Sequence, residues 1–381
     1  MTKPHIAVIG ASAFGGWTAL YLLRSGARVT LVDAWGPGNS RSSSGGETRV
    51  IRGAYGPDQP YTTLAARAMQ LWREHESQWK QRFFFPTGVL WMVEGSGEFE
   101  RGSLPSLKDA GIPFEQLSTR DLAQRWPQID FQKGDWGIYE PQSGYLLARA
   151  SAQAVVERFI AEGGEYRQAA VIAATDHANG SLETPDWNEL SLSDGSRLAA
   201  DGYVFACGPW LGQLFPQTVG PHFVSTKQDV FFFGTPANDP RYNEGNTPVW
   251  ADHSGHFMYG IPGNQHRGFK MADDTRGPQF DPTAGERLID ADRLAEARRY
   301  LANRFPGMKD APLVETRVCQ YENTTDHNFI VDRHPANRDV WIVGGGSGHG
   351  FKHGPALGEM VARLILRDDV ADPIYRLARF K

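Results

Sequence analysis

Two glycine-rich turns at opposite ends of the chain constrain its fold more than any other feature. The first turn, residues 10–16, follows a short apolar run and precedes a segment, residues 17–25, with apolar side chains at helical spacing. A second strand-like run then ends in Asp33. Strand, glycine turn, helix and strand with a terminal acid form the arrangement that binds a dinucleotide, with the pyrophosphate at the helix N-terminus and the acid on a ribose. We therefore predict a dinucleotide site at the start of the chain.

This first turn departs from the usual motif at Ser12, which stands where a second glycine is expected. A Cβ here reduces the room for the pyrophosphate, but the serine hydroxyl can itself bind a phosphate oxygen. The alternative is an ordinary crossover between strands with a glycine-rich turn. The residues predicted to bind the dinucleotide in this unit are Gly10, Ser12, Ala13, Phe14, Gly15 and Asp33.

The second turn, residues 344–352, contains five glycines in nine residues. It follows an apolar run and precedes an apolar helical pattern over residues 355–366. Glycines let the backbone approach a flat ligand and direct its N–H groups at it, and Lys352 adds one fixed positive charge. Because the two turns lie so far apart in sequence, we expect one nucleotide-binding domain assembled from separated segments.

Bulk composition excludes several classes of protein. A chain of 381 residues suits two domains. The balance of 39 basic and 44 acidic residues is not that of a nucleic-acid-binding protein. No apolar run is long enough to span a bilayer, and the chain starts directly with a strand instead of a signal peptide. Its two cysteines, Cys207 and Cys319, do not make a disulfide framework. We expect a cytoplasmic enzyme with no metal site and no nucleic-acid or membrane partner.

Four segments carry a resemblance to a known family. They are the opening turn, residues 47–56 (ETRVIRGAYG), residues 319–332 (CQYENTTDHNFIVD) and residues 347–352 (SGHGFK). In this order and spacing they resemble the monomeric sarcosine oxidase family of FAD-dependent amine oxidases, which includes N-methyltryptophan, pipecolate and fructosyl-amino-acid oxidases. The resemblance covers the whole chain.

The resemblance implies FAD as cofactor and a small amine and O2 as reactants. The implied reaction oxidises the C–N bond of a secondary or primary amino acid, N-alkylated or glycated, to an imine, with O2 reduced to H2O2. It also implies a monomer. Three rivals stay open: an amino acid dehydrogenase using another acceptor, a flavin-bearing scaffold without turnover, and a nicotinamide enzyme.

The fold class expected is α/β (α+β), in two domains. Between residues 221 and 318, short aromatic strands separated by Pro and Gly indicate a mostly antiparallel sheet that forms a substrate platform. We predict a Rossmann-like FAD-binding domain from residues 1–84, 146–220 and 319–381. The substrate domain then comprises residues 85–145 and 221–318.

Cofactor contacts follow from the resemblance. Cys319 matches the cysteine that carries a covalent thioether to the flavin, a reaction that fits the nucleophilicity of a thiolate. The alternative is a buried structural cysteine. Residues 36–46 form either a flexible linker or a loop around the cofactor. Further cofactor-binding residues predicted are Ser43, Ser44, Arg49, Gly348, Gly350 and Lys352.

Catalytic roles are implied for Lys270, Arg49 and His349. Lys270 matches a lysine near the flavin that promotes its reaction with oxygen, where a positive charge stabilises developing negative charge. Strand alternation places Lys270 opposite to Phe269 and Met271, so it points either outward or into a cavity. Arg49 matches an arginine close to the flavin, and His349 acts either as a base or as a positioning residue.

Arg52 and Lys352 match the pair that holds a substrate carboxylate, one with a bidentate fork and one with a point charge. Tyr259 matches a tyrosine that lines the substrate pocket. Asp274 stands where the sarcosine branch has histidine, and an acid there favours a second amine, a guanidinium or sugar hydroxyls over a small amino acid. The neighbouring Asp326 and His327 are interpreted as structural loop residues, although they resemble a catalytic pair.

Overall fold

The first glycine-rich turn joins a buried strand to a helix, as predicted. The computed structural model describes residues 3–172, 182 and 187–381. Its first unit consists of β1 (His5–Ile9), α1 (Ala13–Arg24) and β2 (Arg28–Asp33). Gly10 adopts a φ of 106°, a conformation open to glycine but strained for other residues. Helix α1 therefore begins directly after the turn, earlier than the apolar pattern alone indicated.

Both ends of the chain contribute to one six-stranded sheet. The strand order is β19-β20-β13-β1-β2-β9, and neighbouring strands are parallel except for β19 against β20. Strand β13 therefore lies between the first strand of the chain and a strand that leads into the second glycine-rich turn. The added strands are β9 (Glu165–Gln168), β13 (Gly202–Phe205), β19 (Ile330–His334) and β20 (Asn337–Gly344).

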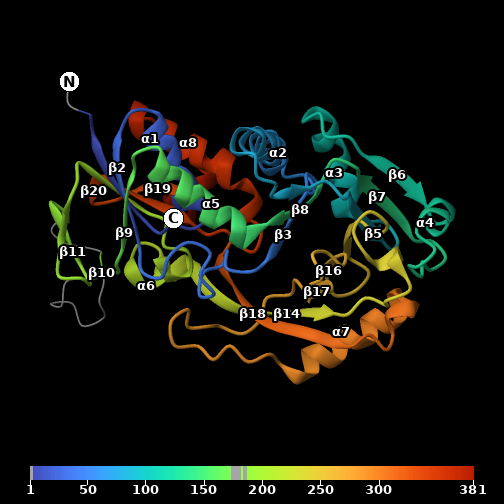
Figure 1. Cartoon of the computed structure of the whole chain (residues 1–381). Helices are drawn as coiled ribbons and strands as arrows, with labels where there is room; N and C mark the ends of the chain where they lie inside the picture. Colours follow the sequence, from blue (N-terminus) through green and yellow to red (C-terminus); the bar gives the residue numbers. More distant parts are fainter. Residues whose placement is uncertain (1–2, 173–181, 183–186) are drawn as a thin grey trace.

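Three helices pack together against this sheet: α1, α5 (Ala148–Ala161) and α8 (Gly354–Arg367). Figure 1 shows them side by side, with segments from the start, middle and end of the chain in one layer. Trp17, Val155 and Leu357, one from each helix, share a buried apolar core. The amphipathic patterns of α5 and α8 predict these contacts, because each carries its apolar residues on one face.

The opposite face of the six-stranded sheet packs against a small sheet made of β10 (Val171–Ile172), β11 (Glu189–Leu192) and β12 (Arg197–Ala199). Strands β11 and β12 are antiparallel and flank the Asp194–Gly195 turn. A layer of helices on one side and a sheet on the other bury the central strands on both faces.

A second, eight-stranded sheet forms the other half of the molecule. Its order is β18-β14-β17-β16-β15-β5-β7-β6, and every neighbouring pair except β15 with β5 is antiparallel. The prediction of a mostly antiparallel sheet is therefore confirmed. The strands are β5 (Val89–Val93), β6 (Glu115–Ser118), β7 (Trp136–Glu140), β14 (Phe223–Phe233), β15 (Val249–Asp252), β16 (Met258–Ile261), β17 (Phe269–Asp273) and β18 (Leu313–Thr324).

Helix α7 (Ala291–Arg304) covers one face of this sheet (Figure 1). Phe269 and Met271 of β17 share the buried core with Leu301 of α7. Because side chains alternate along a strand, Lys270 points to the opposite face, toward the nucleotide-binding half. That face, free of α7, is where the two halves of the protein meet.

A small three-stranded sheet lies near this junction, and further helices complete the fold. The sheet has the order β3-β8-β4, and strand β18 runs without a break through residue 319, where the predicted domain boundary falls. The domain boundaries stay a prediction. These elements are β3 (Thr48–Ile51), β4 (Phe84–Phe85), β8 (Gly144–Leu147), α2 (Gln59–Trp79), α3 (Glu98–Asp109), α4 (Thr119–Arg125) and α6 (Leu211–Leu214).

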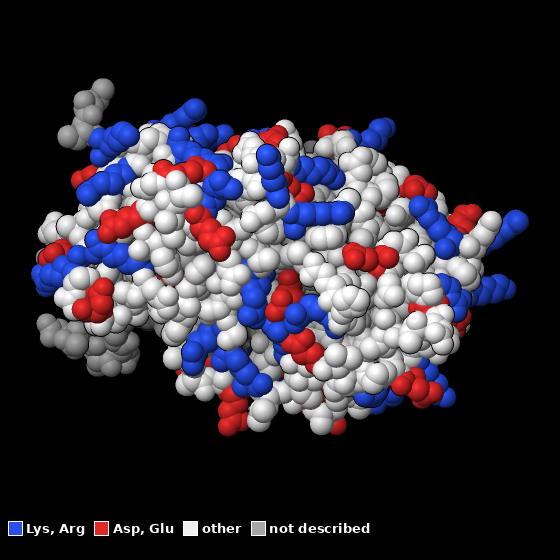
Figure 2. Space-filling model, in the orientation of Figure 1, with Lys and Arg blue, Asp and Glu red and all other residues white. Residues whose placement is uncertain are grey.

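Among the described residues, none of the helices combines the length and the apolar character needed to cross a bilayer. Figure 2 shows acidic and basic side chains interspersed over the visible face of the molecule. This mixture of charges matches the balanced composition of the chain.

Candidate active site

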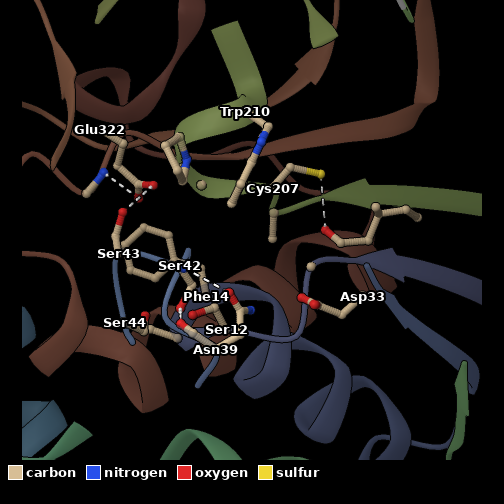
Figure 3. Close-up of a pocket in the computed structure, with 18 of the residues that line it drawn as sticks. Ser12, Phe14, Asp33, Asn39, Ser42, Ser43, Ser44, Cys207, Trp210 and Glu322 are labelled. Atoms are coloured by element: carbon tan, nitrogen blue, oxygen red, sulfur yellow. Dashed lines mark hydrogen bonds between the residues drawn. The ribbon is translucent and has the colours of Figure 1, made fainter. Parts of the chain in front are cut away.

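A long cavity lies at the carboxyl ends of the parallel strands, where open α/β sheets bind their ligands. The two glycine-rich turns form its walls, together with the loop that follows β2 (Figure 3). The structure thus brings together segments that are more than 300 positions apart. Predicted cofactor residues that line this cavity are Gly10, Ser12, Ala13, Phe14, Asp33, Ser43, Ser44, Arg49, Gly348 and Gly350.

The N-terminus of α1 offers free donors to this cavity. Ser12 is the N-cap residue, yet its side chain makes no capping hydrogen bond, and its buried hydroxyl has no hydrogen-bond partner within the described part of the chain. Helix N–H groups without partners attract an anion. Gly15 lies within α1, and a Cβ there would collide with the carbonyl of Gly10. This glycine therefore permits the tight turn, while Ser12 faces the ligand space.

Asp33 fixes the shape of the cavity wall as well as lining it. Its carboxylate accepts hydrogen bonds from the backbone N–H of Ala11 at 2.8 Å, of Trp35 at 2.9 Å and of Gly36 at 2.8 Å. Burial raises the pKa of Asp33, and the three backbone donors oppose this shift. The carboxylate thus ties the first glycine-rich turn to the loop after β2.

The second glycine-rich turn lies close against Tyr321. Gly348 has a φ of 81°, and a Cβ there would come within 2.7 Å of the Tyr321 ring. The exposed backbone of this turn fits the flat ring of FAD. The Ser12 hydroxyl and the N-terminus of α1 fit its pyrophosphate.

Glu322 is a cofactor-cavity residue that the sequence reasoning missed. It is 8% exposed, accepts a hydrogen bond from Gly346 N–H at 3.2 Å and lies 3.5 Å from the Ser43 hydroxyl (Figure 3). Burial raises its pKa to about 7, although these hydrogen bonds oppose the shift. An acid directly after an aromatic residue in the motif that contains Cys319 was the available signal.

A second cavity of about 370 Å3 adjoins the first, and this volume is usual for small-molecule sites. Arg49, Tyr321, Gly348 and Phe351 line both cavities, so the two spaces meet. Predicted active-site residues that line the second cavity are Arg49, Arg52, Tyr259, Asp274, Cys319, His349 and Lys352. We refer to the first space as the cofactor cavity and to the second as the substrate cavity.

Cys319 lies at this junction with a cation at its sulfur. Arg49 donates to the Cys319 sulfur at 3.2 Å and to the carbonyls of Ser43 at 2.6 Å and Thr48 at 2.9 Å. Both cysteines are free thiols. A guanidinium at this distance stabilises negative charge on sulfur, which is the state needed for nucleophilic attack.

Lys270 is buried on the inner face of the sheet, but it is not among the residues that line the two cavities, so its predicted position in a cavity stays a prediction. Its amino group donates to the Thr48 carbonyl at 2.8 Å and lies 5.8 Å from the ring centre of Tyr259. Burial and the nearby charge of Arg49 lower the pKa of Lys270 to about 7. The amine therefore changes charge near neutral pH.

Arg52 and Lys352 reach the substrate cavity from different elements. The guanidinium of Arg52 lies over the rings of Tyr55 at 4.3 Å and Trp91 at 4.9 Å and donates to the Ala54 carbonyl. Lys352 is 4% exposed and belongs to the short helix η5 (Phe351–His353) that precedes α8. A guanidinium and a buried amino group in a largely aromatic cavity form a site for a carboxylate.

Asp274 lines the substrate cavity, and its carboxylate already has a hydrogen-bond donor and an ion-pair partner. It accepts a hydrogen bond from Tyr321 at 2.8 Å and pairs with Arg276 at 3.3 Å. Burial raises the pKa of Asp274, and Arg276 opposes this shift. Arg276 also lines the cavity and was missed from the sequence, because only the fold shows that it also binds Ser347 and Asn323.

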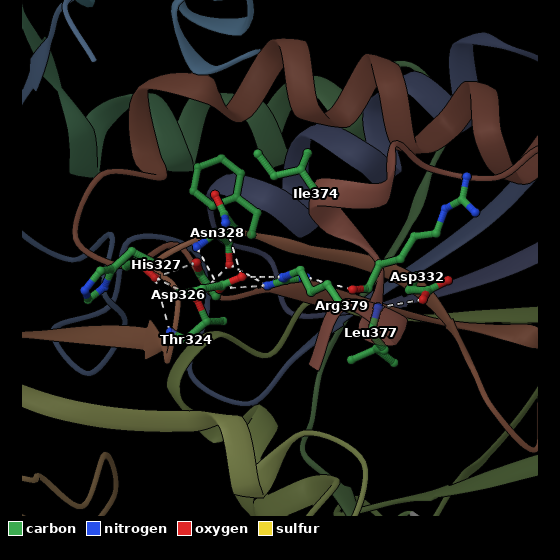
Figure 4. A network of polar contacts seen from close by, with 12 residues as sticks. Thr324, Asp326, His327, Asn328, Asp332, Ile374, Leu377 and Arg379 are labelled. Atoms are coloured by element: carbon green, nitrogen blue, oxygen red, sulfur yellow. Dashed lines mark hydrogen bonds and ion pairs between the residues drawn. The ribbon is translucent and has the colours of Figure 1, made fainter. Parts of the chain in front are cut away.

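Asp326 and His327, interpreted above as structural residues, lie in a loop that is held by an ion pair. Asp326 pairs with Arg379 near the C-terminus at 2.7 Å, and Arg379 also donates to the Asn328 carbonyl at 3.0 Å (Figure 4). His327 has a φ of 62°, and the loop lines the substrate cavity. The C-terminal segment thus holds a strained loop at the cavity wall.

This fold and these adjoining cavities define a flavin-dependent oxidoreductase. The chain belongs to the family described as "FAD dependent oxidoreductase", whose model matches residues 5–364. FAD is therefore its cofactor, and the isoalloxazine ring supplies the redox chemistry when bound.

Particular relatives lie within this family. Monomeric sarcosine oxidase from Bacillus sp. (strain NS-129) is 30% identical over 95% of this chain and 93% of its own length. N-methyl-L-tryptophan oxidase from Yersinia pestis (strain Pestoides F) is 28% identical over 98% of both chains. Among solved structures, L-proline dehydrogenase from P. horikoshii shares the fold with a TM-score of 0.84 and 21% identity, covering 99% of this chain and 98% of that one.

Proposed function

We propose that this enzyme oxidises the C–N bond of a secondary or primary amino acid to an imine and passes the electrons to O2, which becomes H2O2. The observation that carries the proposal is the convergence of Arg52 and Lys352 on a cavity that meets the cofactor cavity. A carboxylate held by these cations places the adjacent C–N bond at the junction of the two spaces. The relatives named for N-methyl amino acids support an N-alkyl amine.

The walls of the substrate cavity favour the neutral amine that oxidation requires. Trp91, Phe257 and Tyr259 contribute aromatic surface, and Arg49 and Arg52 contribute positive charge. Low polarity and nearby cations both disfavour an ammonium ion. The protein therefore orients the substrate and helps to remove its proton, and it needs no strong base on the chain for the redox step.

We propose that Lys270 and Arg49 favour oxygen as the electron acceptor. They donate to one carbonyl, that of Thr48, so two cationic side chains are held together beside the junction of the cavities. Positive charge held in place before the reaction stabilises negative charge that develops during oxygen reduction. His349 is assigned a positioning role, because burial keeps its pKa well below the usual value and its Nε2 lies 3.2 Å from the His327 carbonyl.

A covalent link between Cys319 and the flavin is part of the proposal. The free thiol at the cavity junction and its contact with Arg49 support it. Acid precipitation of the purified enzyme tests the link: the yellow colour should stay with the pellet, and its mass should include the cofactor. Cys319→Ala should release the flavin into the supernatant. Free flavin from the wild-type protein would remove the covalent link but not the fold.

The substrate range is tested by peroxide release. N-methyl amino acids, cyclic secondary amino acids, primary amino acids and glycated amino acids should be screened under air, with a peroxidase-coupled dye. Arg52→Met should raise the KM for the best substrate about tenfold or more, because a charged hydrogen bond is lost. The exposed Arg363→Met is the matched control. An enzyme that bleaches with amines but releases no peroxide would be a dehydrogenase, the second candidate.

Asp274 bears on the choice between simple and glycated amines. Its pairing with Arg276 and Tyr321 leaves less charge to attract a second cation than a free carboxylate has. Asp274→His should shift the profile toward small N-methyl amino acids. An unchanged profile would place Asp274 outside the contacts that select the substrate.

We also propose that the enzyme acts as a monomer in the cytoplasm. Light scattering of the purified holoenzyme and fractionation of its native cells test these two points separately.

A further inference from the structure

Behind Lys352 lies a buried group of side chains that the redox reaction does not use. Tyr55 is 6% exposed and His353 is fully buried, and both lie beside Lys352. The Lys352 amino group donates to the Tyr55 hydroxyl at 2.8 Å and to the His349 carbonyl at 2.9 Å. The Tyr55 oxygen in turn lies 2.7 Å from His353 Nε2 and 3.3 Å from His349 Nδ1.

The directions of these hydrogen bonds follow from the chemistry of each atom. A tyrosine hydroxyl has one hydrogen to donate. A backbone contact with Leu64 favours a proton on Nδ1 of His353. The other ring nitrogen, Nε2, lies 2.7 Å from the Tyr55 oxygen, so it accepts the hydrogen of Tyr55 and directs it away from Lys352. His349 Nε2 faces a carbonyl, which makes its Nδ1 an acceptor as well and excludes it as a competing donor to Tyr55. The lone pairs of the Tyr55 oxygen are then left to accept from Lys352.

This arrangement decides what Lys352 presents to the substrate. An amino group has three positions besides its bond to carbon. Two are N–H groups directed at the Tyr55 oxygen and the His349 carbonyl, so the third faces the substrate cavity. In the neutral amine this third position is a lone pair, and in the ammonium form it is an N–H.

The charges around Lys352 favour the neutral form before a ligand binds. Burial and the positive charge of Arg52 lower the pKa of Lys352 well below its usual value, while Asp274 and Glu140 oppose the shift. Burial lowers the pKa of His349 and of His353 well below the usual value, which disfavours a charged imidazole beside Lys352. A carboxylate that enters the cavity supplies the negative charge that this cluster lacks.

We propose that Lys352 enters the binding step as a neutral amine and takes the proton that the substrate ammonium must lose, and that His353, through Tyr55, keeps its lone pair directed at the cavity. The inference rests on the proposed function. An N–H bond of the substrate ammonium breaks and an N–H bond of Lys352 forms. A zwitterion with a neutral lysine thus becomes an amino acid anion bound to a lysinium, without a change in total charge.

His353 is the positioning residue in this scheme. If His353 is replaced by an apolar residue, the Tyr55 hydroxyl is free to donate to the lone pair of Lys352. That hydrogen bond stabilises the neutral amine and competes with proton uptake. Glutamine at this position keeps an acceptor for the Tyr55 hydroxyl, so it should rescue the function.

Binding of amine-free carboxylates to the holoenzyme tests the proposal without turnover. Methoxyacetate and indole-3-acetate carry no proton to give, so Lys352 must take one from the buffer. Calorimetry in buffers of different ionisation enthalpy, repeated from neutral to alkaline pH, should show a maximum in proton uptake that approaches one proton per bound carboxylate. Changes in flavin absorbance give the dissociation constants in parallel. The Lys352→Met variant should lose the uptake.

The variants give the expected pattern. His353→Leu should weaken carboxylate binding about tenfold at one pH and move the pH at which binding is lost to a lower value, since one hydrogen bond now favours the neutral amine. His353→Gln should stay within about threefold of the wild type. If His353→Leu does not fold, Tyr55→Phe serves instead, because it removes the oxygen that accepts from Lys352. Adding His353→Gln to the Tyr55→Phe variant should then cause no further change in carboxylate affinity or in its pH dependence.

The proposal is overturned by binding without proton uptake, by equal behaviour of the leucine and glutamine variants, or by no carboxylate binding from about pH 6 to about pH 9. Failure of the proposed function is a different result. In that case no amine in the screen yields peroxide or bleaches the flavin, while carboxylate binding and its proton uptake persist.

Discussion

At the scale of the residue, Lys270 is a buried amine poised between two charge states. Its pKa of about 7 implies a cation below neutral pH and a neutral amine above it. We expect the rate of flavin reoxidation by oxygen to fall as the pH rises through about 7. Lys270→Met should slow reoxidation on the order of a hundredfold, remove this pH dependence and affect flavin reduction much less. Stopped-flow mixing of reduced enzyme with oxygen measures both steps.

The exposed Lys309→Met is a control for the loss of one positive charge. Equal slowing of reduction and reoxidation in the Lys270 variant would contradict the role of this lysine in the reaction with oxygen.

Glu322 makes the stability of the enzyme depend on pH in an unusual direction. Its pKa is about 7 in the folded protein and near the usual 4.5 of a glutamate in the unfolded chain, so the folded state binds the proton more tightly. This contribution to the free energy of unfolding is full below about pH 4.5 and is lost as the pH rises to about 7. Glu322→Gln lacks this loss and should gain up to about 3 kcal/mol relative to the wild type over that interval. Thermal unfolding at several pH values measures the difference, and parallel curves would contradict the assignment.

The site residues that could be predicted from the sequence are those that belong to a short local motif. Arg49, Arg52 and Lys352 stand in short segments, and the structure places them at one pair of cavities. Glu322, Arg276 and His353 were not predicted as site residues, because their roles depend on partners from distant parts of the chain. An acid, an arginine or a histidine alone gives no sign of what it will be buried against.

At the scale of the element, the contact between α1 and α8 joins the two glycine-rich turns. Gly358 of α8 lies directly against the backbone of α1, and a Cβ there would come within 2.6 Å of the Trp17 carbonyl carbon and 2.8 Å of Thr18 N. Backbone atoms in a helix give way little. Gly358→Ala should therefore separate the helices and lower the free energy of unfolding by about 1–3 kcal/mol, as overpacking does.

Denaturant unfolding followed by flavin fluorescence measures this change. Arg363→Ala, on the exposed side of the same helix, is the matched control. If the two variants unfold alike, the close approach of α8 to α1 does not limit stability.

The elements themselves were largely predictable, and the exceptions have a physical cause. Apolar side chains recur at helical spacing in the sequences of α1, α2, α5, α7 and α8, which lie against sheets or other helices. Helices α3 and α4 give a weaker signal: α3 contains Pro105 and four residues that are buried, and α4 is only seven residues long. Short helices held by tertiary contacts leave a weak periodic signal.

At the scale of the whole molecule, the C-terminal segment supports the wall of the substrate cavity. Arg379 binds both Asp326 and the Asn328 carbonyl and so holds the loop between them in its strained shape. Arg379→Met should raise the KM several-fold and leave kcat nearly unchanged, since the loop touches the ligand space but not the reacting bond. Steady-state kinetics with the best substrate of the screen measures both constants.

The ion pair between Arg379 and Asp326 also predicts that the protein loses stability at acid pH. Burial would raise the pKa of Asp326, but hydrogen bonds from Arg379 and Asn328 lower it to about 2. The stabilising pair is therefore complete above about pH 4 and is lost as the pH falls toward 2.

Lys381→Met is the control for the steady-state kinetics of Arg379→Met. A change in kcat alone in the Arg379 variant would contradict a role limited to the loop.

The participation of both chain ends in one cofactor cavity has a consequence for biosynthesis. Gly10 leaves the ribosome early, but its counterpart Gly350 follows only 340 residues later. At ordinary elongation rates this interval lasts roughly 20–70 s. Flavin capture must therefore await synthesis of the second glycine-rich turn, and chains that stop before that turn should emerge colourless.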